Sequence, residues 1–337
     1  MNVVDTIDQG IVRVAPGVES QEVEVTANVT ALCVNRGSVV FGLGDGRVLR
    51  LSNGEIAAIG QHDGVVTSLA MLADGKIVSA GQDGRVCVDG TELFSAKDEW
   101  ITCLCSNASK TRLAIAYGKR VEVVENGQVI ARLGDLPSTV TGIHFFEKGD
   151  RIAISHYNGI SLWEFSKLAR PVVLSWRGSM TGVSISPDGR FVAGPTQDRE
   201  IHVWDLVTEK DYRLGGYQRK VSAIGWTSDA PYLYSTGADV LVSWGLSSDP
   251  GTIPPVEIGY AFEQTVSAIV PTCKSTIMPA GYTDGSIIVG EVQKGTAKIV
   301  RRADGGAVTA LAEGPDGTFA FGTAKGNVGI FRLKVAS

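Results

Sequence analysis

The sequence predicts an all-β fold, a β-propeller of four-stranded antiparallel blades, from three observations. One four-residue pattern recurs eight times along the 337 residues. Tight-turn signals and short apolar runs follow each copy. Glycine is abundant, with 41 residues, and charged residues make up 20% of the chain, which is typical of short strands joined by turns. A single four-stranded meander exposes two apolar faces, so neighbouring units must stack, and a radial stack that closes on itself is a propeller.

The recurring pattern is an apolar residue, Thr or Ser, a small residue, and then Leu, Ile or Val. We call each copy an anchor and expect it to begin the first strand of a unit. Successive anchors lie 35 to 45 residues apart, a period typical of propeller blades. Eight equivalent hydroxyls argue for structure rather than nucleophilic catalysis, so we expect them to bond to neighbouring backbone and to line the central channel. The anchors are VTAL at Val29, VTSL at Val66, ITCL at Ile101, VTGI at Val140, MTGV at Met180, VSAI at Val221, VSAI at Val266 and VTAL at Val308.

A turn signal 16 to 18 residues after each anchor separates the second strand from the third. Asp-Gly and Asn-Gly between alternating residues mark hairpins, because both central residues of a type I′ turn need positive φ. We expect the aspartates here to be turn formers. The signals are Asp45-Gly46, Asp83-Gly84, Gly118-Lys119, Asn158-Gly159, Asp198-Arg199, Asp239, Asp284-Gly285 and Lys325-Gly326. Further turns, at Asn53-Gly54, Asp89-Gly90 and Asn126-Gly127, lead into a fourth strand.

The eighth unit lacks a fourth strand. After Val308 the chain offers only the runs TFAFG and NVGIFRL, whereas QEVEV, from Gln21 to Val25, precedes the first anchor without a unit of its own. We therefore expect eight blades, with the N-terminal strand closing the last one. The alternative is a seven-bladed ring with one unit packed outside it. Residues 20–337 are expected to form one propeller domain, and residues 1–19 a segment outside the repeat pattern.

One residue conflicts with this strand assignment. Pro279, in TIMPAG, falls on an interior strand of the seventh blade, where its missing N–H interrupts the ladder. The sequence predicts a bulge or an early strand end there.

The fifth unit combines SPDGR at Ser186 with Trp204-Asp205. This pair resembles the signature of the WD40-repeat family, and Trp163 and Trp244 hold the same tryptophan position in two other units. The resemblance extends over nearly the whole chain with degenerate repeats. It implies a propeller whose N- and C-terminal segments share a blade, and a non-catalytic protein-interaction scaffold that binds a protein or peptide on its narrower face.

Charge and cysteine content restrict the partners and the compartment. The formal net charge of −5 has no long block of either sign, which argues against nucleic-acid binding. No apolar run approaches the ~20 residues of a membrane helix, and the N-terminus does not resemble a signal peptide. Five irregularly spaced cysteines are typical of reduced thiols. The sequence thus predicts a cytoplasmic protein that binds neither nucleic acid nor membrane.

Groups for catalysis are few. The four histidines, His62, His144, His156 and His202, fall in different parts of different units, and GLGDGR at Gly42 has no helix after it to bind phosphate. Cys103 and Cys105 could form half of a metal site, but Cys103 occupies the small-residue slot of its anchor. We expect no enzyme activity, no metal and no cofactor. The alternative is a propeller enzyme or small-ligand binder that uses the central channel.

Partner contacts are expected in the loops before each first strand and after each second strand, which meet on the narrower face. Trp, Tyr and Arg are the residue types that concentrate interface energy. The candidates are Trp100, Tyr117, Tyr157, Trp176, Arg177, Tyr217, Arg219 and Tyr282.

Overall fold

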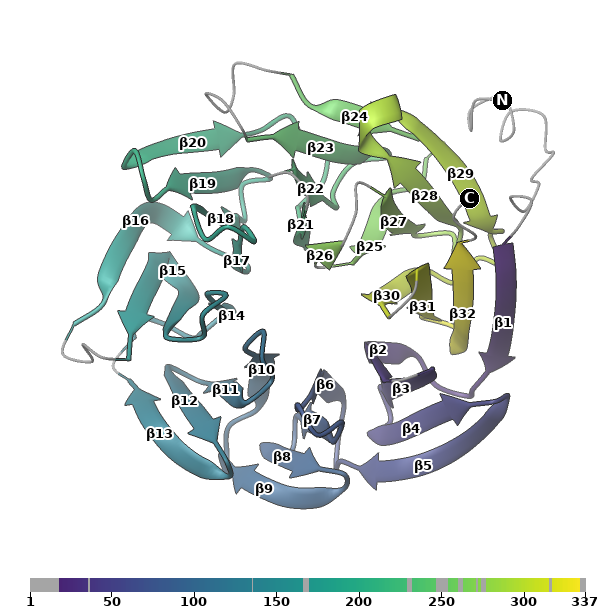
Figure 1. The fold of residues 1–337 in the computed structure, drawn as a ribbon, viewed down its shortest axis with the longest axis horizontal. Coiled ribbons are helices and arrows are strands. Elements are labelled where there is room, and N and C mark those ends of the chain that lie inside the picture. The colour runs from purple at the N-terminus through teal and green to yellow at the C-terminus, as the bar shows by residue number, and fades with distance from the viewer. Residues whose placement is uncertain are drawn as a thin grey trace. The chain divides into compact units, whose positions relative to one another are not determined.

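The computed structural model describes residues 18–35, 37–134, 136–165, 170–228, 232–246, 254–259, 263–270, 272–273, 277–314 and 317–333. They form eight β-sheets, and the fold is an eight-bladed β-propeller, as predicted (Figure 1). The alternative of seven blades with an extra unit is wrong. Residues 1–17 lie outside the described residues, and the division into one domain from residue 20 onward stays a prediction.

Four blades have consecutive strands in simple order. Blade 1 contains β2 (Val29–Asn35), β3 (Ser38–Leu43), β4 (Arg47–Ser52) and β5 (Glu55–Gln61). Blade 2 contains β6 (Val66–Met71), β7 (Ile77–Gly81), β8 (Arg85–Val88) and β9 (Thr91–Ser95). Blade 3 contains β10 (Ile101–Ser106), β11 (Arg112–Tyr117), β12 (Arg120–Glu125) and β13 (Gln128–Leu133). Blade 5 contains β17 (Ser184–Ile185), β18 (Phe191–Pro195), β19 (Ile201–Asp205) and β20 (Lys210–Leu214).

The other four blades vary this plan. Blade 4 contains β14 (Gly142–Phe145), β15 (Arg151–Glu164) and β16 (Val172–Ser179). Blade 6 contains β21 (Ile224–Thr227), β22 (Tyr232–Ser235), β23 (Leu241–Gly245), β24 (Val256–Ile258) and β26 (Thr272–Cys273). Blade 7 contains β25 (Val266–Ile269), β27 (Ile277–Tyr282), β28 (Ile287–Glu291) and β29 (Thr296–Arg301), with a short 3-10 turn η1 (Val292–Lys294). Blade 8 contains β30 (Val308–Glu313), β31 (Thr318–Thr323), β32 (Asn327–Leu333) and β1 (Val18–Glu24).

One of these variations, the extra strand of blade 6, was not expected, whereas the fold-back in blade 4 comes at the predicted Asn158-Gly159 turn. Strand β15 covers both middle positions of blade 4, because it folds back on itself: Phe165 N donates to Asp150 O at 3.0 Å, and Asn158 and Gly159 have positive φ. Strand β26 adds a fifth strand to blade 6 and pairs in parallel with β21. Counting four strands in each repeat does not reveal β26, because this strand comes from the connection between β25 and β27 of the next repeat.

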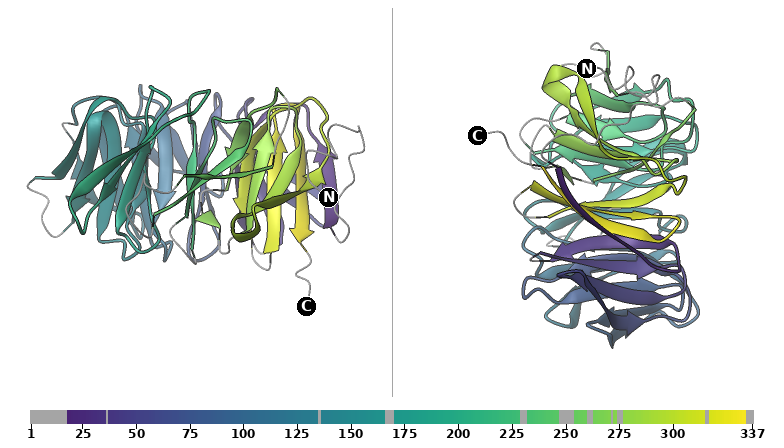
Figure 2. Two further views of the ribbon diagram at one scale, coloured as in Figure 1. Left: turned by 90° about the horizontal axis from the view of Figure 1, so that it is seen from above. Right: turned by 90° about the vertical axis from the view of Figure 1, so that its right-hand side faces the viewer.

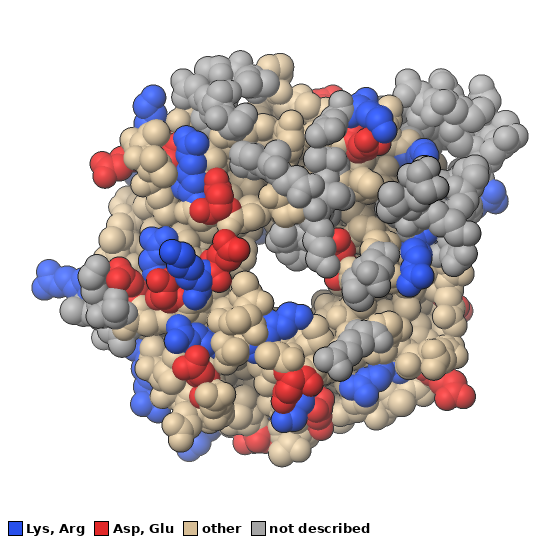
Figure 3. Space-filling view, viewed as in Figure 1, with Lys and Arg blue, Asp and Glu red and all other residues tan. Residues whose placement is uncertain are grey.

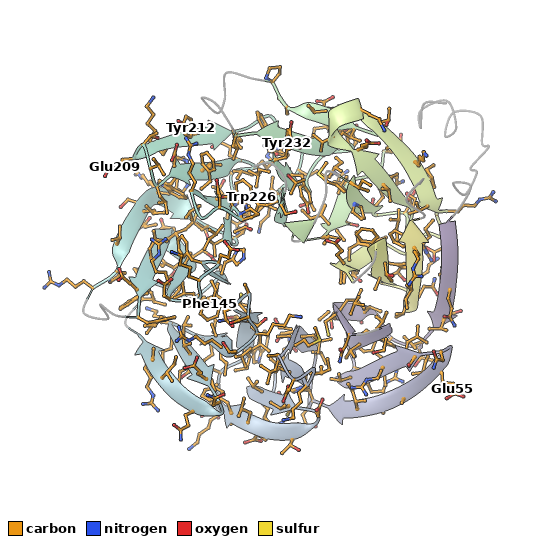
Figure 4. All side chains as sticks on the ribbon, in the orientation of Figure 1. Glu55, Phe145, Glu209, Tyr212, Trp226 and Tyr232 are labelled. Atoms are coloured by element: carbon orange, nitrogen blue, oxygen red, sulfur yellow. The ribbon has the colours of Figure 1, made fainter. Side chains whose placement is uncertain are left out.

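The described chain divides into two compact units. One contains the described residues up to Val39, Leu51–Glu55 and those from Gly216 onward; the other contains Val40–Arg50 and Ile56–Gly215. In each unit the second strands of the blades are buried, as in β7, β18 and β31, whereas outer strands such as β5 and β20 are largely exposed. Figure 4 shows this polarity, with Phe145 on β14 and Trp226 on β21 among packed side chains, and with Glu55 on β5 and Glu209 in the hairpin before β20 at the outer edge.

The predicted closure of the last blade is confirmed. Strand β1 pairs antiparallel with β32 from Val18 opposite Leu333 to Glu24 opposite Asn327. It begins three residues before the predicted Gln21 and ends one residue before the predicted Val25. The purple β1 lies beside the yellow β32 in Figure 2, so the two ends of the described chain complete one sheet.

The anchors form a repeated structural device. Five of the eight begin the first strand of a blade, and those at Val140, Met180 and Val221 precede it by two to four residues. In β6, β10, β25 and β30 the register shifts between the first and third anchor residues, so the Thr or Ser between them leaves the ladder. Its hydroxyl then donates to a carbonyl of the second strand, as Thr102 does to Ala116 O at 3.0 Å. The expected bond to neighbouring backbone is therefore confirmed for these four hydroxyls, whereas those of Thr141 and Ser222 contact the side-chain hydroxyls of Ser155 and Thr236.

In blades 7 and 8 the same hydroxyls also reach the next blade. Ser267 Oγ lies 2.7 Å from Val308 O, and Thr309 Oγ1 lies 2.7 Å from Val29 O. In each case the acceptor is the first residue of the following anchor. One side chain thus satisfies the register shift in its own blade and links two blades.

The turns divide into two types. The Asn-Gly turns have positive φ at both central residues, as at Asn53 and Gly54, Asn126 and Gly127, and Asn158 and Gly159, which fits type I′. At Asp45-Gly46, by contrast, only the glycine has positive φ, and the aspartate accepts a hydrogen bond from Arg47 N at 3.2 Å. Asp83 and Asp284 do the same with the residues two positions on. The aspartates are turn formers, as expected, but through their carboxylates rather than their φ.

Pro279 neither bulges nor ends its own strand. It lies opposite Val289 within β27, whereas the pairing of β27 with β25 stops at Ala280 opposite Ile269. The inner neighbour, β25, ends at Ile269 and so does not pair with Pro279, which has no N–H to donate. No helix among the described residues is long and apolar enough to cross a membrane.

Candidate partner-binding site

The loops that the sequence singled out lie at one end of each blade. The first strand begins and the second strand finishes at this end, which we call the upper end; the opposite end is the lower end. Between blades 3 and 4 the upper ends are joined, because Val140 N donates to Gly118 O at 2.8 Å. Tyr157 N also donates to Ser138 Oγ at 2.7 Å. The first bond links the loops of two neighbouring blades, and the second fixes the connection before β14 to the β15 hairpin.

Four of the eight candidates are accessible. Trp100, just before β10, is 62% exposed, and Tyr157, in the β15 hairpin, is 51% exposed. Arg177 on β16 and Arg219, before the sixth anchor, are also exposed. Beside Trp100, the Glu99 carboxylate lies 3.5 Å from Arg120 Nη1. The structure therefore brings Trp100 and Tyr157 to the upper ends of adjacent blades, and Arg219 belongs to the other compact unit.

Three candidate tyrosines are buried: Tyr117, Tyr217 and Tyr282. Tyr117 Oη donates to Glu122 Oε1 at 2.9 Å, and burial together with this carboxylate raises the pKa of Tyr117 to about 12. Burial also raises the pKa of Tyr282 well above its ordinary value. A buried ring cannot make first contact with a partner, so these side chains support their blades.

Trp176 is half-buried and joins blades 4 and 5. Its ring lies 4.2 Å from that of His202, and the Arg213 guanidinium stacks over it at 4.5 Å. His202 Nε2 in turn lies 2.8 Å from Asp211 Oδ2. Burial lowers the pKa of His202, against the opposing effect of Asp211. This cluster covers the side of blade 5 rather than presenting Trp176 to solvent.

A buried polar network at the upper end of blade 2 was missed by sequence reasoning. His62 Nδ1 lies 3.0 Å from Asp83 Oδ1, and His62 Nε2 lies 2.9 Å from Ser79 Oγ. Burial alone would raise the pKa of Asp83, but hydrogen bonds from His62 and from the backbone N–H of Arg85 and Asp63 lower it to about 2. These hydrogen bonds fix the connection before β6 against β7 and the turn that follows it.

Blade 6 has the same network with different residues. Tyr217 Oη lies 2.6 Å from Ser235 Oγ and accepts a hydrogen bond from Trp244 Nε1 at 2.9 Å. His62, Trp176 and Tyr217 each stand four residues before their anchor. This shared position in the repeat could have indicated the network from the sequence. A position whose side chain forms buried hydrogen bonds in one repeat is expected to have a structural role in the others.

Two hollows adjoin the candidates. One, of about 410 Å³, is lined by Tyr117, Arg120, Glu122, Arg132 and Trp163. The other, of about 70 Å³, lies beside Arg219 and is lined by polar residues including Asp239 and Glu263. Both can offer hydrogen bonds and charge to a partner.

The cysteine pair lies apart from these hollows. Burial raises the pKa of Cys103 to about 12 and that of Cys105 to about 11, so both thiols stay protonated. Within the described ranges no group of His, Cys, Asp or Glu side chains could hold a metal ion.

Comparison with known protein families agrees with this geometry. The family model described as "WD domain, G-beta repeat" matches residues 54–88 and 171–205. By this match, residues 54–88 and 171–205 are WD40 repeats. Each matched WD40 repeat begins near the outer strand of one blade and ends on the third strand of the next, and the first includes His62, Ser79 and Asp83.

Two curated relatives and one solved structure show how far the likeness extends. A "66 kDa stress protein" of Physarum polycephalum is 26% identical over 184 residues, covering 50% of this chain and 30% of its own length. "Cell division cycle 20.1, cofactor of APC complex" of Arabidopsis thaliana is 26% identical over 91 residues, covering 26% of this chain and 19% of its own length. The chain thus matches less than a third of either relative. The crystal structure of the computationally designed Ika8 protein superposes with a TM-score of 0.72 at 23% identity, covering 92% of this chain and 98% of that one, and supports the fold.

Proposed function

We propose that this WD40-repeat propeller is a non-catalytic protein-interaction scaffold whose partner docks at the upper ends of blades 3 and 4. The observation that carries the proposal is the exposure of Trp100 and Tyr157, 62% and 51% respectively. Most large aromatic side chains of a folded domain are covered, and exposed Trp and Tyr are the residues that most often dominate binding energy at protein interfaces.

The loop that carries Tyr157 supports the proposal because hydrogen bonds hold it in place before any partner arrives. Val140 N bonds to Gly118 O, and Tyr157 N bonds to Ser138 Oγ. A surface that is ordered in advance loses less conformational entropy on binding. The exposed Arg177 on β16 supplies a charged group from the same blade as Tyr157.

Charge supports a protein partner over a nucleic acid. Figure 3 shows Lys and Arg interspersed with Asp and Glu across the visible face, without one large basic area. The formal net charge of −5 also argues against a nucleic-acid partner. Cys87, Cys103 and Cys105 are free thiols, which fits a reducing compartment, and we place the protein in the cytoplasm without a membrane partner.

The matched relative described as a cofactor of a complex suggests the same class of activity, binding to other proteins. Because that match covers 26% of this chain, it supports the class of function and not a particular partner.

The experiment compares partners recovered by the wild-type chain with those recovered by Trp100→Ala combined with Tyr157→Ala. Val207→Ala is the matched control, since Val207 is 73% exposed but lies at the hairpin between β19 and β20, at a lower end. The double variant should lose specific partners by roughly tenfold or more, as hot-spot residues do. Unchanged recovery by a correctly folded double variant would refute the proposed face. Stoichiometric metal in the purified protein would instead favour the alternative of an enzyme or small-ligand binder.

A further inference from the structure

A groove of about 480 Å³ separates the lower ends of blades 2 and 3. Its walls are the connection from β6 to β7, the connection from β10 to β11, and the turn at Asn126 and Gly127. It belongs entirely to one compact unit and lies at the opposite end of blade 3 from Trp100.

The floor of the groove is apolar. Leu113 and Val124 are buried members of the core between the two blades, and Leu72, Val88 and Leu93 are half-buried side chains packed against that core. Their remaining surface faces the groove, where covering it would contribute about 25 cal/mol for each Å² removed from water.

The walls are ordered by their own hydrogen bonds. Ala73 N donates to Lys110 O at 3.0 Å, which ties the two connections to each other. Asn107 Oδ1 accepts from the backbone N–H of Thr111 and of Arg112, both at 2.9 Å. The groove therefore exists in the free protein, and a ligand need not order it.

The rim carries one uncompensated positive charge. Three of the lining side chains are ionisable: Asp74, Lys76 and Lys110. Lys76 Nζ lies 2.8 Å from Asp74 Oδ2, so these two neutralise each other. Across the described part of the chain no carboxylate pairs with Lys110, which leaves its ammonium group to attract an anion from outside.

We propose that this groove is a second docking site, which binds a short segment of a partner protein through apolar side chains followed by an acidic residue. The groove volume falls in the ~300–1,000 Å³ range of ligand sites and is larger than the volume of one side chain. Two apolar side chains of the bound segment therefore occupy the floor. The carboxylate of the acidic residue pairs with Lys110. The site goes beyond the proposed function, because it uses the other end of the blades and none of the aromatic candidates.

The probe is a display library of random ten-residue peptides, selected on the immobilised full-length chain. Wild type should enrich peptides with two apolar residues followed by Asp or Glu by roughly tenfold or more over the unselected library. Lys110→Glu should reverse the preference toward Lys or Arg at the acidic position, and Leu93→Arg should abolish enrichment. The matched control Lys97→Glu, which changes an exposed lysine in the loop before β10 at the upper end, should select the same peptides as wild type.

Two results would overturn the site. One is the absence of any enriched pattern on wild type; the other is an enrichment that survives both Leu93→Arg and Lys110→Glu. Circular dichroism melting of each variant checks that it is folded, and Lys110→Glu, on the rim, tests the site even if Leu93→Arg destabilises the blade. Trp100→Ala with Tyr157→Ala should select the same peptides as wild type, so failure of the upper-end proposal and failure of this one give different results.

Discussion

Glu22 and Arg301 form an ion pair between β1 and β29, although 279 positions separate them in the chain. Glu22 Oε1 lies 2.6 Å from Arg301 Nη2, and the same guanidinium nitrogen lies 2.6 Å from Asp304 Oδ2. Arg301 is only 9% exposed and stacks over the Phe321 ring at 4.9 Å. The closing strand is thus fixed by its backbone to β32 and by a side chain to the preceding blade.

Replacing Glu22 with Gln should lower the free energy of unfolding by about 1–3 kcal/mol, because a largely buried guanidinium loses one of its two carboxylates. Glu24→Gln is the matched control, since Glu24 is an exposed residue of the same strand, and it should change little. Urea unfolding measures both. Equal effects of the two substitutions would argue that the pair contributes nothing to closure.

Deletion of residues 1–27 should destabilise the protein far more than Glu22→Gln. The deletion removes β1 and exposes the edge of β32, whose backbone then lacks its partner along seven paired positions. Calorimetry should show a fall in melting temperature of several degrees or more. A truncated protein that melts near the wild-type temperature would be incompatible with closure by β1.

Gly322→Ala should cost more than 2 kcal/mol of stability, roughly the scale of overpacking a core. A Cβ at Gly322, on β31, would collide with the Val29 side chain, where the anchor of blade 1 packs against blade 8. Gly134→Ala is the control, because a Cβ at Gly134 meets no atom within 4 Å. Denaturant midpoints of the two variants should therefore differ clearly, and equal midpoints would contradict the contact.

The free energy of unfolding should decrease as the pH is lowered, because burial favours the neutral form of His144. Ile185 N donates to His144 Nδ1 at 3.0 Å, which requires a neutral ring nitrogen, and burial lowers the pKa of His144 to about 4 although part of the residue stays accessible. A base with a folded pKa below its ordinary 6.5 contributes stability that is complete above pH 6.5 and is lost as the pH falls toward 4.

The measurement is urea unfolding of wild type and His144→Gln at about pH 7.5 and about pH 4.5. Wild type should lose on the order of 1–3 kcal/mol more than the variant over this interval. Parallel losses in both proteins would show that His144 does not titrate across folding.

Tyr217→Phe and Trp100→Ala should separate stability from binding. The hydroxyl of Tyr217 bonds to Ser235 and Trp244, so its removal should cost about 1–2 kcal/mol of stability and leave partner recovery unchanged. Trp100→Ala should do the opposite, since its ring is exposed. Loss of partners from a stable Tyr217→Phe protein would restore Tyr217 to the binding site.

Tyr217 is buried, although the sequence analysis named it among the partner-binding candidates. His62, Trp176 and Tyr217 all stand four residues before an anchor, yet one is imidazole, one indole and one phenol. Their residue types suggested interface aromatics for Trp176 and Tyr217, whereas His62 was considered only as one of four scattered histidines. Reading them by position would have suggested one structural role, which the bonds of His62 and Tyr217 confirm.

The sequence alone predicted eight blades, with seven as the alternative, together with the Asn-Gly turns and the closing strand, because these depend on local rules. Asn53 and Gly54 both adopt positive φ, alternating residues define a strand, and the missing fourth strand of blade 8 had a single unused candidate in β1. Only the tertiary structure decided which candidate side chains meet solvent. Tyr157 and Tyr282 both end or follow a second strand, but one is exposed and the other is buried. The difference comes from how neighbouring strands and loops pack around each ring, contacts between residues far apart in the chain that no local pattern encodes.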